Sequence, residues 1–174
     1  MQITTQPLRT PPAAMPKNGL FFGIMIPHTE SQKFAACFQS FRRTYRFTNK
    51  PIGSDRLHIS LYSVYAGDEL SEAEVQTAIR VGDAIRFGPF PVTFDRALTY
   101  RNAKLKMPFV LAAPDSADPI NGLRFQLGRK HSRLIVWDQI SVPENSIEPL
   151  TIIVQEFALV RSHIGFGKYD ILNR

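Results

Sequence analysis

Apolar residues are spaced first as in a strand and then as in a helix along the start of the chain. Residues 19–26 form a short apolar run that Pro27 closes, which is typical of a buried strand. Residues 56–65 alternate strongly in polarity and predict a second strand. A helix that Thr29 caps is predicted between them. The apolar positions that repeat at helical spacing in it are Phe34, Cys37, Phe38, Phe41 and Tyr45.

The rest of the chain continues this mixture of helices and strands. Ser71 and Glu74 form a capping box that predicts the start of a second helix, which the Gly-Pro pair at 88–89 ends. The Asp-Pro pair at 118–119 is typical of the start of a third helix. The predicted strands are 90–100 and 107–113, paired as a hairpin, then 134–137, 150–160 and 168–172, with a loop at 143–149. Strands that follow one another without helical crossovers predict an α+β fold with mainly antiparallel sheets.

Length and composition indicate a single soluble domain. The 174 residues suffice for one domain with its own core. Residues 1–18 predict a flexible leader, because they hold four prolines, no acidic residue and no apolar run, and residues 19–174 form the domain. No stretch reaches the roughly 18 apolar residues of a membrane span. Cys37 is the single cysteine, which favours the reducing cytoplasm, and a monomer is the default expectation.

Charge favours a polyanionic partner. Lys and Arg number 21 against 15 Asp and Glu, a net charge of +6. Three clusters, 42–56, 96–106 and 124–133, each carry a net charge of +4. One such cluster is usually a solvated surface. Three together, one with Tyr100 and Arg101 in a predicted hairpin loop, favour RNA or an oligonucleotide, because cations hold phosphates and aromatic rings stack on bases.

Motifs for several other classes of protein are absent. The sequence has no CxxC, GxxxxGK[ST] or GxGxxG pattern, which argues against a zinc module, a P-loop NTPase and a dinucleotide-binding protein. The four histidines, His28, His58, His131 and His163, do not show the spacing of metal ligands. We therefore expect no metal and no cofactor.

His58 is the histidine whose neighbours indicate chemistry. Because side chains alternate across a strand, His58, Ser60 and Tyr62 are predicted to share one face. The other face then holds Leu57, Ile59 and Leu61. An imidazole can give or take a proton near neutral pH, and a hydroxyl can donate to a phosphoryl oxygen. The same pattern also fits a half-exposed histidine on an ordinary amphipathic strand.

Three segments in order resemble the 2H phosphoesterase superfamily, which includes bacterial 2'-5' RNA ligases and RNA 2',3'-cyclic phosphodiesterases. They are the opening LFFGIMIP at 20–27, the His-x-Ser of 58–60, and the closing FALVRSHIG at 157–165 before YDIL at 169–172. The resemblance spans most of residues 19–172. It implies a bilobal α+β fold with two His-x-Thr/Ser motifs facing each other across a central cleft. One histidine would then act as general base and the other as general acid, while the hydroxyls hold the phosphate without a metal.

The second motif departs from this family pattern. Residues 134–138, LIVWD, look like the tail of the strand that should carry it, but RKHSR precedes them at 129–133. If His131 is the second histidine, Arg133 stands where Thr or Ser is expected. Three interpretations are open. The sequence lacks a short segment before Leu134, His131 acts from a shifted position, or the site is degenerate.

The resemblance leads to a specific expectation about function. We expect a metal-independent phosphoesterase that opens the 2',3'-cyclic phosphate end of RNA, or in reverse joins RNA ends as a 2'-5' ligase, with His58 and Ser60 as catalytic residues. The expected substrate contacts are Tyr62, Tyr100, Arg101, His131 and Arg133. The alternatives are a non-catalytic RNA-binding protein that lost its second histidine and a phosphodiesterase of a small cyclic nucleotide derivative.

Overall fold

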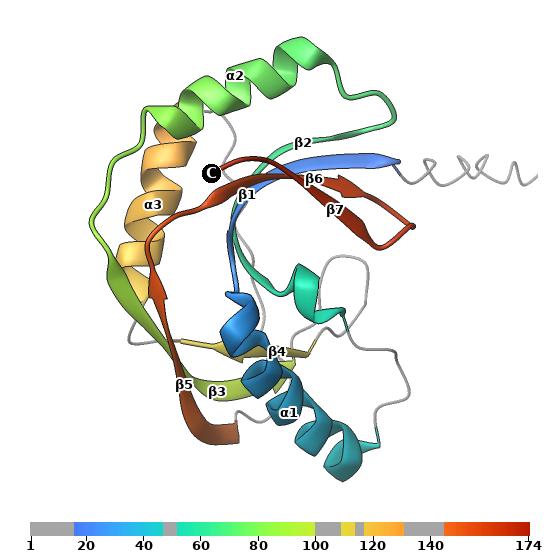
Figure 1. Cartoon of the computed structure of the whole chain (residues 1–174), viewed down its shortest axis with the longest axis vertical. Coiled ribbons are helices and arrows are strands. Elements are labelled where there is room, and N and C mark those ends of the chain that lie inside the picture. The colour runs from blue at the N-terminus through green and yellow to red at the C-terminus, as the bar shows by residue number, and fades with distance from the viewer. Residues whose placement is uncertain (1–15, 47–51, 100–108, 114–116, 131–144) are drawn as a thin grey trace, which may run out of the picture.

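The computed structural model describes residues 16–46, 52–99, 109–113, 117–130 and 145–174, and within them it has three α-helices and seven strands (Figure 1). The elements in chain order are β1 (Asn18–Met25), α1 (His28–Tyr45), the 3₁₀ helix η1 (Ser54–Arg56), β2 (His58–Gly67), α2 (Glu72–Asp83), β3 (Phe90–Thr99), β4 (Phe109–Ala112), α3 (Ala117–Lys130), β5 (Asn145–Val154), β6 (Ala158–His163) and β7 (Lys168–Asn173). β1 thus includes the last residue of the predicted leader. None of the described helices is long and apolar enough to cross a membrane.

The strands form two antiparallel sheets. The first has the order β2-β1-β6-β7, and the second has the order β4-β3-β5. In Figure 1, α2 runs across the first sheet and α1 lies beside the second. The predicted α+β class with antiparallel sheets is therefore confirmed, as is the hairpin of β3 and β4. The predicted strand at 134–137 lies outside the described residues.

The core occupies one face of the first sheet. Leu20, Phe22 and Ile24, every second residue of β1, are at most 2% exposed. They pack in one cluster with apolar residues of the three helices and of the second sheet, among them Phe34, Ala78, Val92, Phe94, Leu123, Leu127 and Ile152. Burying a side chain of this size contributes about 1.5 to 3 kcal/mol. This face is thus closed, and the opposite face of the first sheet is the one left to build a site.

The chain changes sheet between β5 and β6. The apolar run at 150–160 predicted one strand, but β5 ends at Val154 in the second sheet and β6 starts at Ala158 in the first. Residues 145–149 of the predicted loop also belong to β5. The pairing of β3 with β5 shifts register between Phe94 and Arg96, which leaves Pro149 in an irregular part of an edge strand. Proline is tolerated there because its missing N–H breaks no ladder.

Helix boundaries follow local capping, with two corrections. α1 begins at His28 with Pro27 as its N-cap, so Thr29 is not the cap. α3 includes Ala117, one residue before the predicted start at Asp118. At α2 the predicted capping box is confirmed: the Ser71 side chain accepts from the backbone N–H of Glu74, and the Glu74 carboxylate accepts from that of Ser71.

Replacing Ser71 with alanine should lower the free energy of unfolding by about 1 kcal/mol, because the first turn of α2 loses an acceptor for its unpaired N–H groups. Urea unfolding followed by circular dichroism measures the change. Ser71→Asp keeps an N-cap acceptor and should stay close to the parent protein. A Ser71→Ala variant as stable as the parent would contradict this role of the cap.

Candidate active site

His58 and Ser60 lie on the open face of the first sheet. His58 begins β2 opposite Met25, and Ser60 lies opposite Gly23, so both alternate with the buried residues of β1. Gly23 has no side chain, and the ring of Phe21 covers it, with Cε2 3.0 Å from where a Cβ on Gly23 would be. The imidazole and the hydroxyl therefore face the same side of the sheet, which is the side away from the core.

Tyr62 does not share that face, and the predicted substrate contact is corrected. The register of β1 and β2 passes from Phe22–Tyr62 to Gly23–Ser60, so Leu61 is an extra residue in a bulge. The bulge reverses the alternation that the sequence pattern assumes. Leu61 and Tyr62 are both buried, and Tyr62 lies opposite Phe22 in the core.

Two aromatic rings enclose the imidazole of His58. The ring centroid of His58 lies 5.0 Å from that of Phe21 and 5.5 Å from that of Tyr169, and those two rings lie 5.5 Å from each other. Because β2 and β7 are the two edges of the first sheet, their side chains can meet only if the sheet coils strongly. Residue spacing did not indicate the roles of Phe21 and Tyr169, although both lie in the segments that carry the family resemblance.

The protonation of His58 follows from these neighbours. Its Nδ1 lies 2.7 Å from the backbone oxygen of Arg56, which can only accept, so Nδ1 holds the hydrogen and Nε2 the lone pair in the neutral ring. Burial lowers the pKa of His58, the Arg56 carbonyl partly opposes this, and the Arg56 charge adds to the lowering. His58 is therefore neutral near pH 7, with Nε2 able to accept a proton.

Two arginines flank the His-x-Ser strand, each from a different basic cluster. The Cζ atom of Arg56 lies 5.8 Å from the centre of the Tyr169 ring, a cation–π contact. The guanidinium of Arg124, on α3, donates to the backbone oxygen of Ser60 at 2.9 Å. Burial lowers the pKa of Arg124. Within the described part of the chain, the Arg56 guanidinium forms no ion pair, and its charge is open to an anionic ligand.

The remaining candidates are four predicted site residues and two histidines that were not predicted to be site residues. Tyr100, Arg101, His131 and Arg133 lie outside the described residues. His28 is the first residue of α1, as its place after Pro27 indicates. His163 lies opposite Asn18, on the core face, and its Nε2 is 2.6 Å from a carboxylate oxygen of Asp170. Hydrogen bonds from His163 and Lys168 lower the pKa of Asp170.

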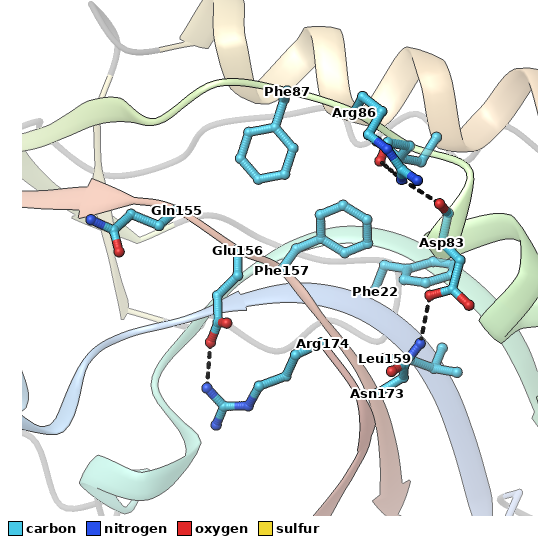
Figure 2. A pocket seen from close by; sticks show the side chains of 12 residues that line it. Phe22, Asp83, Arg86, Phe87, Gln155, Glu156, Phe157, Leu159, Asn173 and Arg174 are labelled. Atoms are coloured by element: carbon cyan, nitrogen blue, oxygen red, sulfur yellow. Dashed lines mark hydrogen bonds and ion pairs between the residues drawn. The ribbon is translucent and has the colours of Figure 1, made fainter.

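Two cavities lie near the crossing from the second sheet to the first. One, of about 350 Å³, is lined by Phe22, Phe87 and Phe157 and by the ion pair of Glu156 with Arg174 (Figure 2). It lies on the Phe22 side of the first sheet, away from His58. The other, also of about 350 Å³, is lined by Met25 and Ile171 of the first sheet and Ile153 of the second. Because Met25 is the register partner of His58, this second cavity lies beside the candidate site.

Comparison with solved structures identifies the fold. LigT from Escherichia coli complexed with phosphate matches with a TM-score of 0.66 and 19% identity, covering 92% of this chain and 97% of that one. Its complex with 3'-AMP matches with a TM-score of 0.63 and 18% identity, covering 91% and 95%. The chain has the LigT fold. TT0787 of Thermus thermophilus matches with a TM-score of 0.55 and 19% identity, covering 89% and 95%.

The likeness to LigT confirms the predicted α+β fold with mainly antiparallel sheets. No family model and no curated protein matches the sequence, so the likeness is carried by structure. It covers 92% of the chain. In this fold the His-x-Ser pair lies on β2, an edge strand of the first of the two antiparallel sheets.

Proposed function

We propose that this protein is a phosphoesterase that opens 2',3'-cyclic phosphate ends of RNA without a metal. The observation that carries the proposal is the setting of His58. Its Nδ1 is tied to the Arg56 carbonyl, its Nε2 is available, and the Ser60 hydroxyl lies on the same face of β2. A neutral imidazole with one fixed tautomer is suited to take a proton from an attacking water.

The proposed step assigns one role to each side chain. Nε2 of His58 removes a proton from water while the water oxygen forms a bond to phosphorus. The bond between phosphorus and one ribose oxygen breaks, and that oxygen takes up a proton from a general acid, which yields a phosphate monoester and a free hydroxyl. Ser60 donates a hydrogen bond to a phosphoryl oxygen as charge develops there. Among the described residues no second imidazole contacts His58. We propose His131 as the acid, acting from the shifted position that is one of the three interpretations of the second motif.

The positive charge beside the site supports an RNA substrate. Arg56 and Arg124 come from separate basic clusters and lie at the two ends of the His-x-Ser segment. Arginine pairs well with phosphate oxygens because its guanidinium presents several donors in one plane. The structural neighbours add support, since LigT has been solved with phosphate and with 3'-AMP.

The decisive assay uses the full chain, EDTA and a short oligonucleotide that ends in a 2',3'-cyclic phosphate. Mass spectrometry should show the addition of one water to the oligonucleotide, and EDTA should not slow the reaction. Binding of the oligonucleotide without any change of mass would contradict the proposal and favour the RNA-binding alternative. Activity that disappears in EDTA and returns with a divalent cation would contradict the metal-independent mechanism.

The pH profile should report the buried setting of His58. As the general base it must be neutral, and burial lowers its pKa from the ordinary value of about 6.5. The acid limb of kcat/KM should therefore lie below about pH 6.5, with activity falling as the pH drops through the lowered pKa. Initial rates measured from acid to mildly alkaline pH locate this limb.

Phe21→Ala tests whether burial is the cause of the lowered pKa of His58. Removing the ring admits water to the imidazole, which raises the pKa of His58 toward its ordinary value and moves the acid limb to higher pH. Phe21→Leu keeps an apolar neighbour and should leave the limb closer to its original position. An acid limb that stays in place, or moves to lower pH, in Phe21→Ala would show that burial by Phe21 does not set the pKa.

A further inference from the structure

The hairpin between β6 and β7 presents an aromatic ring to solvent. Phe166 is 83% exposed, more than any other large apolar side chain in the described part of the chain. Gly165 and Gly167 on either side have φ angles of 90° and 64°, and the N–H of Phe166 donates to the His163 oxygen at 3.1 Å. The left-handed glycines make a tight turn possible, and this turn keeps the phenyl ring out of the core.

The same hairpin reaches the candidate site. A side chain built on Gly167 would begin 3.3 Å from Nη1 of Arg56, so the turn lies against that guanidinium. Two residues further, Tyr169 contacts both Arg56 and the His58 ring. Phe166 is therefore the chain neighbour of a glycine that lies against Arg56, and Arg56 borders the proposed catalytic histidine.

We propose that Phe166 stacks on a base of a single-stranded RNA whose cyclic phosphate end lies at His58, with Arg56 holding an intervening phosphate. An exposed ring on a turn that contacts a guanidinium with no ion pair among the described residues is suited to hold a single strand, because every base has a face on which an aromatic ring can stack. The proposal rests on the proposed function and narrows it. The substrate is an oligonucleotide, because the base on Phe166 belongs to a nucleotide that the phosphate at Arg56 separates from the cyclic end.

Two substrates separate this inference from the proposed function. Hydrolysis of a 2',3'-cyclic mononucleotide and of a short RNA oligonucleotide with the same cyclic end should be compared in the full chain and in Phe166→Ala. The variant should lose about ten-fold in kcat/KM on the oligonucleotide, mainly through KM, because one stacked base is lost. Its activity on the mononucleotide should stay unchanged. Phe166→Trp should restore the oligonucleotide activity, and Phe125→Ala, an exposed phenylalanine of α3, is the control.

The other outcomes overturn the inference. Equal losses on both substrates would show that Phe166 acts through the structure of the hairpin, and no loss on either would show that the ring does not meet RNA. If the parent protein hydrolyses neither substrate, the proposed function fails. Whether Phe166 stacks on RNA is then tested by measuring RNA binding. A fluorescent single-stranded RNA with a 3'-phosphate should then bind about ten-fold more weakly to Phe166→Ala, and equal binding would overturn the inference.

Discussion

Replacing His58 with alanine is expected to lower kcat/KM on a cyclic-phosphate oligonucleotide by about 10²- to 10⁴-fold, the range that a general base contributes. The loss should fall on kcat. Oligonucleotide binding should persist, since Arg56 and Arg124 remain. Rates over a range of substrate concentrations, with anisotropy for binding, separate the two effects. Circular dichroism checks the fold, because the imidazole packs on Phe21 and Tyr169.

His163→Ala is the matched control for this experiment. His163 lies on the first sheet as well, but it lies opposite Asn18 on the core face and is paired with Asp170. Its loss should leave kcat within a few-fold of the parent value. Full activity in His58→Ala, or equal losses in both variants, would contradict the assignment of His58 as the base.

Replacing Ser60 with alanine is expected to lower kcat by about 10²-fold, the lower end of what one hydrogen bond to developing charge contributes. The hydroxyl acts on phosphoryl oxygens whose charge grows in the transition state, so KM should change little. Ser60→Thr retains a hydroxyl and should keep most of the activity. Steady-state kinetics on the cyclic-phosphate oligonucleotide compare both variants with the parent protein.

Ser63→Ala is the control on the same strand. Ser63 is exposed and lies opposite Phe21. It therefore faces the same side of the sheet as Ser60, on the other side of the bulge in β2. The proposed geometry places the phosphate at Ser60, and Ser63→Ala should therefore keep its kcat. A loss in Ser63→Ala as large as in Ser60→Ala would show that the phosphate is not held at Ser60.

The sequence predicted correctly those helices and strands whose formation depends on interactions between residues close together in the chain. The Ser71–Glu74 capping box is such a case, since two side chains satisfy the backbone of one helix turn without any distant partner. The apolar run of β1 is another, because three alternate residues bury on one face. The sequence pattern predicted wrongly where pairing with a distant strand decides which sheet a segment joins. The run at 150–160 predicts one strand, yet its halves belong to different sheets.

The candidate site shows the same division. His58 and Ser60 lie on one face of β2 as their spacing predicts, because alternation holds over three residues. Tyr62 departs from the prediction because a bulge at Leu61 adds one residue against β1, and the sequence has no signal for it. Phe21 and Tyr169 were not predicted to surround the imidazole, because they come from β1 and β7. Arg56 is only two residues away, but the sequence pattern placed it inside the strand, whereas the structure has it at the end of η1.

The amino-acid sequence by itself determined the class of the fold, the His-x-Ser pair and the excess of positive charge. These follow from periodicity and composition, which are local properties of the chain. The tertiary structure alone decided which atoms of His58 can react and how its pKa shifts. The reacting atom depends on the turn from η1 into β2, which sets the Arg56 carbonyl against Nδ1. The pKa depends on burial by aromatic rings that come from β1 and β7.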